Sequence, residues 1–123
     1  MTALPPITVS RSDYTRLHNL LDQRDDDSEV AAQLYRELDR ATVVEDAAMP
    51  GDVVALNSFV SFVNEMSGST HRVQLVLPRD HRPGETVSVL VPAGAALLGL
   101  KVGDDIAWPS DGKTLRLRLI SVD

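Results

Sequence analysis

The sequence predicts an α+β protein, in which a short N-terminal antiparallel helical hairpin, coiled-coil-like in its pattern, precedes a small β domain with one short helix. Two observations predict this class. Apolar residues recur at helical spacing over the first 45 residues, and from Val53 onward they alternate with a period of two. We therefore divide the chain into a helical hairpin, residues 1–45, and a β domain, residues 46–123.

The first part of the chain is expected to contain two helices. The first, at about 11–24, begins at a cap formed by Ser10 or Ser12, and the second is capped by Ser28. The short connection implies antiparallel neighbours. Each helix has about a dozen residues and reaches about 20 Å. Because isolated helices of that length are marginal, we expect the base of the hairpin to pack against the β domain.

The second part is expected to form four or five antiparallel strands around one short helix. Pro92 presets a first helical turn and Gly99 suits a C-terminal cap, which places that helix between them. Phe59 and Phe62 have opposite parity on one strand and are expected to face opposite sides of the sheet. The strands are expected at residues 58–64, 72–77, 86–91, 106–108 and 115–122.

Charge excludes one class of partner. The net charge of the 123 residues is −6. Residues 1–48 carry 5 basic and 10 acidic side chains, and residues 49–123 carry 7 and 8. Neither part offers the basic surface that binding to a phosphate backbone requires, so we expect no direct nucleic-acid partner.

Cysteine and hydropathy exclude further classes. With no cysteine there is no disulfide, thiolate zinc site or catalytic thiol. No apolar run approaches the roughly 20 residues that span a bilayer, and the N-terminus lacks the features of a signal peptide. We expect a soluble, cytoplasmic protein without a membrane partner.

One group of residues has chemical potential, namely Asp25, Asp26 and Asp27 together with Glu29. Carboxylates at a tight turn can ligate Mg²⁺, and they can equally form a solvated hairpin tip. The sequence favours the solvated tip. We therefore expect no metal and no cofactor, and we treat these four residues as a candidate site for binding a partner.

Other motifs do not indicate catalysis. Gly94 to Gly99 is a near miss to a phosphate-binding loop, because Leu100 separates the second glycine from Lys101 and the βαβ context is missing. There is no nucleophile elbow around any serine. The histidines lack the spacing of metal ligands. We expect His18 at the seam between the two helices, and we expect His71 and His81 at the surface.

The stretches Pro92–Asp104 and Trp108–Gly112 resemble the C-terminal domain of the GreA/GreB transcription factors. Met49–Ser58 narrows the resemblance to the Rnk family, regulators of nucleoside diphosphate kinase, which carry that domain behind a short helical hairpin. The resemblance implies an FKBP-like fold, a curved antiparallel sheet around a helix. It also implies RNA polymerase as a partner, because Gre-type factors insert a long hairpin with an acidic tip into the secondary channel and promote transcript cleavage.

This chain departs from the Gre pattern in its shorter hairpin and in lacking the Gre signature at the tip, so no catalytic residue is carried over. We predict a non-enzymatic, Gre-factor-like regulator that binds RNA polymerase near the secondary channel without transcript cleavage and regulates nucleoside diphosphate kinase. Its docking surface would include the turn Met66–Thr70 and the loop Pro78–Gly84.

Two alternatives remain open. One is a direct protein regulator of nucleoside diphosphate kinase with no polymerase role. The other is a weak FKBP-like prolyl isomerase. Such isomerases rely on a cavity lined by several aromatic side chains, and the predicted β domain has only Phe59, Phe62 and Trp108.

Overall fold

The structure is a computed structural model that describes residues 6–24, 28–110 and 112–123. Its helices are α1 (Arg11–Arg24), α2 (Glu29–Arg40), α3 (Pro92–Leu97) and the 3₁₀ turns η1 (Asp46–Ala48) and η2 (Pro78–Asp80). Its strands are β1 (Thr8–Ser10), β2 (Thr42–Val44), β3 (Phe59–Asn64), β4 (Ser69–Val76), β5 (Thr86–Ser88), β6 (Asp105–Ser110) and β7 (Lys113–Val122). The predicted α+β class is confirmed.

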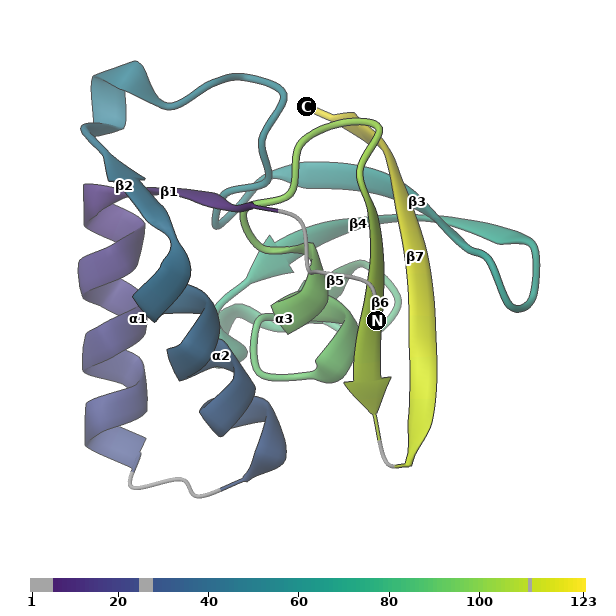
Figure 1. Cartoon of the computed structure of the whole chain (residues 1–123), viewed down its shortest axis with the longest axis horizontal. Coiled ribbons are helices and arrows are strands. Elements are labelled where there is room, and N and C mark those ends of the chain that lie inside the picture. The colour runs from purple at the N-terminus through teal and green to yellow at the C-terminus, as the bar shows by residue number, and fades with distance from the viewer. Residues whose placement is uncertain (1–5, 25–27, 111) are drawn as a thin grey trace.

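The two long helices begin where local signals place them. Ser10 Oγ accepts a hydrogen bond from the Asp13 N–H at 3.2 Å, so Ser10 and not Ser12 caps α1. Ser28 Oγ accepts one from the Ala31 N–H at 3.2 Å and caps α2. The helices lie side by side along one side of the molecule, below the small parallel pair formed by β1 and β2 (Figure 1).

The main sheet has the order β5-β4-β3-β7-β6. The prediction of a wholly antiparallel sheet is wrong, because β5 runs parallel to β4 while the other neighbours are antiparallel. A tight turn would have produced an antiparallel neighbour, but the loop of residues 77–85, which contains η2, carries the chain back before β5 begins. The sheet is therefore mixed.

The strand predicted at residues 86–91 is also shorter than expected, since β5 ends at Ser88. The Leu90 N–H donates to Ser88 Oγ at 3.1 Å, and the Val91 N–H donates to the Ser88 carbonyl at 3.1 Å. These two bonds turn the chain out of the sheet and into α3, which starts at Pro92.

One hydrophobic core joins the helices to the sheet. Helix α3 contacts α2 on one side and β5 and β6 on the other (Figure 1). A single buried cluster includes side chains from α1 and α2, from α3 and from the main sheet. Among them are Leu17, Leu34, Leu38, Leu97, Trp108 and Leu117. The base of the helical part therefore packs against the β domain, as the marginal length of its helices predicts.

The two phenylalanines of β3 face opposite sides of the sheet, as predicted. Phe62 is 7% exposed and belongs to the core, whereas Phe59 is 45% exposed. Among the residues that the structure describes, no helix is long and apolar enough to cross a bilayer.

Candidate functional site

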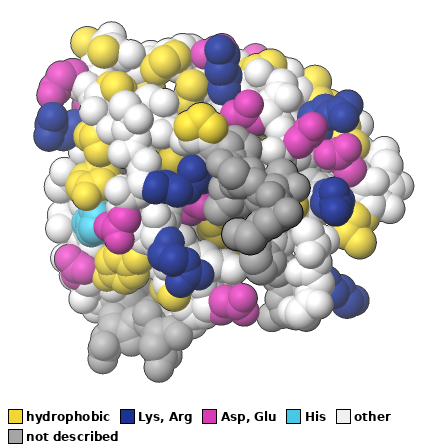
Figure 2. Space-filling view, viewed as in Figure 1, with side chains coloured by type: hydrophobic (Ala, Val, Ile, Leu, Met, Phe, Trp, Pro, Cys, Tyr) yellow, Lys and Arg dark blue, Asp and Glu magenta, His cyan; other side chains and the backbone are white. Residues whose placement is uncertain are grey.

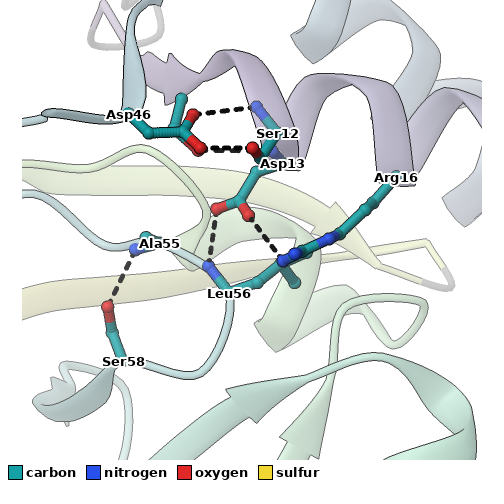
Figure 3. A network of polar contacts seen from close by, with 8 residues as sticks. Ser12, Asp13, Arg16, Asp46, Ala55, Leu56 and Ser58 are labelled. Atoms are coloured by element: carbon teal, nitrogen blue, oxygen red, sulfur yellow. Dashed lines mark hydrogen bonds and ion pairs between the residues drawn. The ribbon is translucent and has the colours of Figure 1, made fainter.

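A buried carboxylate links α1 to the loop that leads into the main sheet. Asp13, in the first turn of α1, is only 5% exposed. Its Oδ2 accepts the Leu56 N–H at 3.0 Å, and its Oδ1 lies 3.6 Å from a guanidinium nitrogen of Arg16 (Figure 3). Burial raises the pKa of Asp13, and the Leu56 N–H and Arg16 oppose that rise. Asp13 thus ties the start of α1 to the segment that leads into β3.

A second carboxylate binds the same end of α1 from the solvent side. Asp46, the first residue of η1, accepts the Ser12 N–H at 3.0 Å through Oδ1 and the Ser12 hydroxyl through Oδ2 (Figure 3). These hydrogen bonds, the hydroxyl first, lower the pKa of Asp46. An exposed ion pair between Arg11 and Glu45, 2.9 Å, lies beside them. The negative charge sits at the helix N-terminus, where the helix dipole favours it.

We call Ser12, Asp13, Arg16, Asp46 and Leu56 the junction. The loop that presents Leu56 is itself held by a hydrogen bond from the Ala55 N–H to Ser58 Oγ at 3.0 Å (Figure 3). The hydroxyl of the junction, that of Ser12, donates to Asp46, whose lowered pKa makes it a weak base. Its chemistry suits orientation of the helices relative to the sheet.

The sequence did not single out the junction. Local pattern makes Asp13 a favourable first-turn residue of α1 and indicates nothing more. Its partner Leu56 lies 43 positions away, so no local spacing connects the two. The local sequence offers only a serine cap followed by an acid at the third helical position, and that pattern predicts a bond from the Ser10 N–H to Asp13 and not a bond to Leu56.

The predicted acidic site lies mostly outside the described residues. Asp25, Asp26 and Asp27 all fall in that part of the chain. Glu29 is the first residue of α2 and is exposed, and its Oε1 accepts a hydrogen bond from Gln33 Nε2 at 3.4 Å. Binding of a partner by these four residues therefore stays a prediction.

The histidines lie where the sequence places them. His18 is at the seam of the helices, with its ring 4.5 Å from that of Tyr14 and 5.9 Å from that of Tyr35. His71 and His81 are exposed. Within the described ranges, no three His, Asp or Glu side chains are grouped so that they could hold a metal ion.

The surface combines mixed charge with a few exposed apolar side chains. On the face in Figure 2, Lys and Arg are interspersed with Asp and Glu, so no single-sign field covers it. Met66, in the turn between β3 and β4, is 66% exposed. On the outer face of the sheet, Phe59 lies 5.8 Å below the guanidinium of Arg72. Exposed side chains of this kind are common anchors in protein interfaces.

The comparisons with known proteins cover nearly the whole chain. Residues 5–44 match the family model described as Rnk N-terminus, and residues 49–123 match the model described as transcription elongation factor GreA/GreB, C-terminal. The chain is 41% identical over 110 residues to a protein of Escherichia coli (strain K12) named regulator of nucleoside diphosphate kinase. The aligned segment covers 88% of this chain and 81% of that protein.

Two further comparisons involve transcription proteins. The chain is 31% identical over 88 residues to the transcription inhibitor protein Gfh1 of Thermus thermophilus, covering 69% of this chain and 55% of that protein. A solved structure described as a prokaryotic transcription elongation factor GreA/GreB from Nitrosomonas europaea superposes with a TM-score of 0.76 and 41% identity, covering 96% of this chain and 98% of that one.

Proposed function

The chain belongs to the Rnk family and has a GreA/GreB-like fold, and from this premise we propose that it is a non-enzymatic regulator that binds RNA polymerase near the secondary channel. In this proposal it acts by occupancy, without transcript cleavage, and it regulates nucleoside diphosphate kinase. The observation that supports it most is the two-part layout, in which helices are joined to a GreA/GreB-type domain. Over 96% of the chain, this layout superposes on a structure described as a GreA/GreB factor.

The β domain, residues 46–123, would be the docking unit, FKBP-like in fold. Its contact surface would include the 66–70 turn with the exposed Met66 and the 78–84 loop. The helical unit, residues 1–45, would form a coiled-coil-like antiparallel hairpin that points into the channel. Asp25, Asp26 and Asp27, with Glu29, would then contact the partner. A cytoplasmic location follows from such a partner.

The junction gives this proposal a geometric requirement. A hairpin can enter a channel only if its direction relative to the docking domain is set, and the contacts of Asp13 and Asp46 are the polar contacts that set the start of α1. Loss of the junction should therefore reduce competition with a Gre factor while docking persists.

The direct test is retention of RNA polymerase on the immobilised full chain at low salt. We expect retention by the parent chain and by a variant with Asp25, Asp26 and Asp27 all changed to Asn. We also expect this variant to compete less well with a Gre factor, because its tip no longer adds to the contact that the docking surface makes. Asp52→Asn, an exposed acid elsewhere, is the control and should behave like the parent. If no polymerase is retained at low salt, the proposal fails.

One alternative is favoured by a specific observation. The relative with 41% identity is named for the regulation of nucleoside diphosphate kinase, and this chain could act on that kinase directly, with no polymerase role. Titration of the purified kinase with the chain separates the two readings. A saturable change in kinase activity without polymerase supports the alternative, whereas no change leaves the transcriptional route as the explanation.

Prolyl isomerase activity has no comparable support. Phe62 and Trp108 are packed in the core, at 7% and 2% exposure, and Phe59 faces the opposite side of the sheet. These three side chains therefore do not converge on one cavity. A peptide isomerisation assay is expected to show no rate above background.

A further inference from the structure

A groove lies between α1 and η2, and it begins at Arg16, which also belongs to the junction. Its volume is about 300 Å³, at the lower end of the range for small-molecule pockets. One wall is formed by four residues of α1 at positions i, i+3, i+4 and i+7, which helical periodicity places on one face: Arg16, Asn19, Leu20 and Gln23. The other wall is formed by Leu77, Pro78 and Arg79.

The side chains that line this groove carry hydrogen-bond donors and positive charge. Two guanidinium groups, Arg16 and Arg79, come from opposite walls, and two amides, Asn19 and Gln23, come from the helix. No carboxylate is among the described residues that line it. Leu20 and Leu77 supply an apolar base. Guanidinium groups bind phosphate through paired N–H donors, and amides add further donors.

Both guanidinium groups are weakly engaged. The side chain of Arg79 is 80% exposed, and its ion pair with Asp80 is 3.9 Å long. Arg16 lies 3.6 Å from Asp13. By contrast, Arg118 on β7 lies 2.9 Å from Asp105. An incoming anion at the groove would compete with these long contacts, and at Arg16 it would also have to overcome the nearby negative charges of Asp13 and Asp46.

A neighbouring hollow extends the same chemistry. It has a volume of about 320 Å³, shares Arg79 with the groove, and is also lined by Arg82 and His81. Asp80 is the one carboxylate among the described residues that line it. The loop after β4 thus carries Arg79, Arg82 and His81 beside Asp80 and Glu85, so it is close to neutral in a chain whose net charge is −6.

We propose that the groove between α1 and η2 binds a small phosphate-bearing ligand, with the phosphate held by Arg16 and Arg79 and an attached apolar group on Leu20 and Leu77. The ligand would touch both the helical part and the loop of the β domain. It would therefore bind the assembled arrangement in preference to one in which the helices have moved away, and would stabilise it by mass action. Binding needs neither RNA polymerase nor the kinase, so it is tested on the chain alone.

The experiment is an NMR titration of the full chain with inorganic phosphate, pyrophosphate, a nucleoside diphosphate and, as a carboxylate probe, citrate. We expect saturable shifts of the Asn19 and Gln23 side-chain amides, with the nucleoside diphosphate binding more tightly than pyrophosphate because of the apolar base. Tighter binding of citrate than of every phosphate probe overturns the phosphate assignment. Absence of saturable shifts at about 20 mM of each probe, well above the millimolar range of weak specific binding, overturns the site.

Two variants test the residues. Arg79→Gln removes one charge-assisted contact and should weaken binding about tenfold, and Asn19→Asp should weaken it at least as much by placing a carboxylate in the groove. Both positions are exposed, so folding should be unaffected. Arg116→Gln, an exposed arginine on β7, is the matched control and should leave the affinity unchanged. Equal weakening by Arg79→Gln and Arg116→Gln would show a general charge effect and overturn the proposal.

Discussion

Helices α1 and α3 both contribute apolar side chains to the core that they share with the main sheet, but their remaining contacts differ in kind. Helix α3 is held by close apolar packing, in which Ala95, Ala96 and Leu97 are each at most 1% exposed and the backbone at Gly94 lies directly against the Ser88 carbonyl. Helix α1 is held at its start by carboxylate hydrogen bonds, those of Asp13 and Asp46 (Figure 3).

The difference has a physical consequence. Close packing leaves no room for adjustment, because an added atom forces the surrounding backbone to move. Carboxylate contacts respond to pH and, where they are exposed, to salt. Any control over the direction of the helices should therefore act at α1 and not at α3.

The largest expected effect comes from filling the space at Gly94. A Cβ there would overlap the Ser88 carbonyl and approach the Val89 Cα to 3.1 Å, and both are backbone atoms that cannot rotate away. We expect Gly94→Ala to lower the free energy of unfolding by about 3 kcal/mol or more, measured by urea denaturation. Gly51→Ala is the control, since nothing lies within 4 Å of its new Cβ. Equal stability of the two variants would contradict the close approach.

A smaller loss is expected from removing the buried carboxylate of α1. Asp13→Ala leaves the Leu56 N–H without its partner in a buried position, which costs about 1–3 kcal/mol. Hydrogen exchange at the Leu56 amide should accelerate more than at the Val54 amide, which donates to the Leu100 carbonyl and is not touched by the change. If both amides accelerate equally, the destabilisation is global and the contact is not its source.

A third prediction concerns pH and separates Asp13 from other groups. Because burial raises its folded pKa, protonated Asp13 stabilises the fold at low pH, and this contribution is lost as pH rises from about 4 through the folded pKa. Asp13→Asn cannot titrate. The unfolding free energy of Asp13→Asn minus that of the parent should therefore increase with pH over that window.

Taking this difference cancels Glu37, whose pKa burial also raises and which is present in both proteins. A difference that stays constant between pH 4 and pH 7 would show that Asp13 has the same pKa folded and unfolded.

The smallest effect is expected at the exposed edge of the junction. The side chains of Arg11 and Glu45 are 63% and 70% exposed, so Arg11→Gln should change the free energy of unfolding by no more than about 0.5 kcal/mol at low salt. The change should disappear in about 0.5 M salt. A larger change in the free energy of unfolding that persists in salt would contradict the prediction, because it would mean that the ion pair is shielded from solvent.

The parts of the fold that the sequence predicted correctly depend on neighbouring residues. Helix α1 spans the predicted residues, Ser28 caps α2, and α3 begins at Pro92, because caps, proline and helical periodicity act within a few positions. The direction of β5 was mispredicted because it depends on the path of the loop that precedes it, which alternation of apolar residues does not encode.

The candidate site divides in the same way. The acidic residues 25–27 stand out in the sequence as a run of like charge, and their role remains a proposal. The pairing of Asp13 with Leu56 and the facing of Arg16 by Arg79 join positions that are tens of residues apart. No spacing rule within one helix or strand relates such positions, so neither the junction nor the groove was predicted.

The sequence by itself determined the family, the class of fold, the ends of the main helices and the two faces of β3, because each follows from local pattern and composition. Only the tertiary structure decided which carboxylate is buried, which strand runs parallel, and which arginines share a groove. Those outcomes depend on how α1 and the loops before β3 and β5 pack around one core. Burial of Asp13 where these segments pack is what raises its pKa.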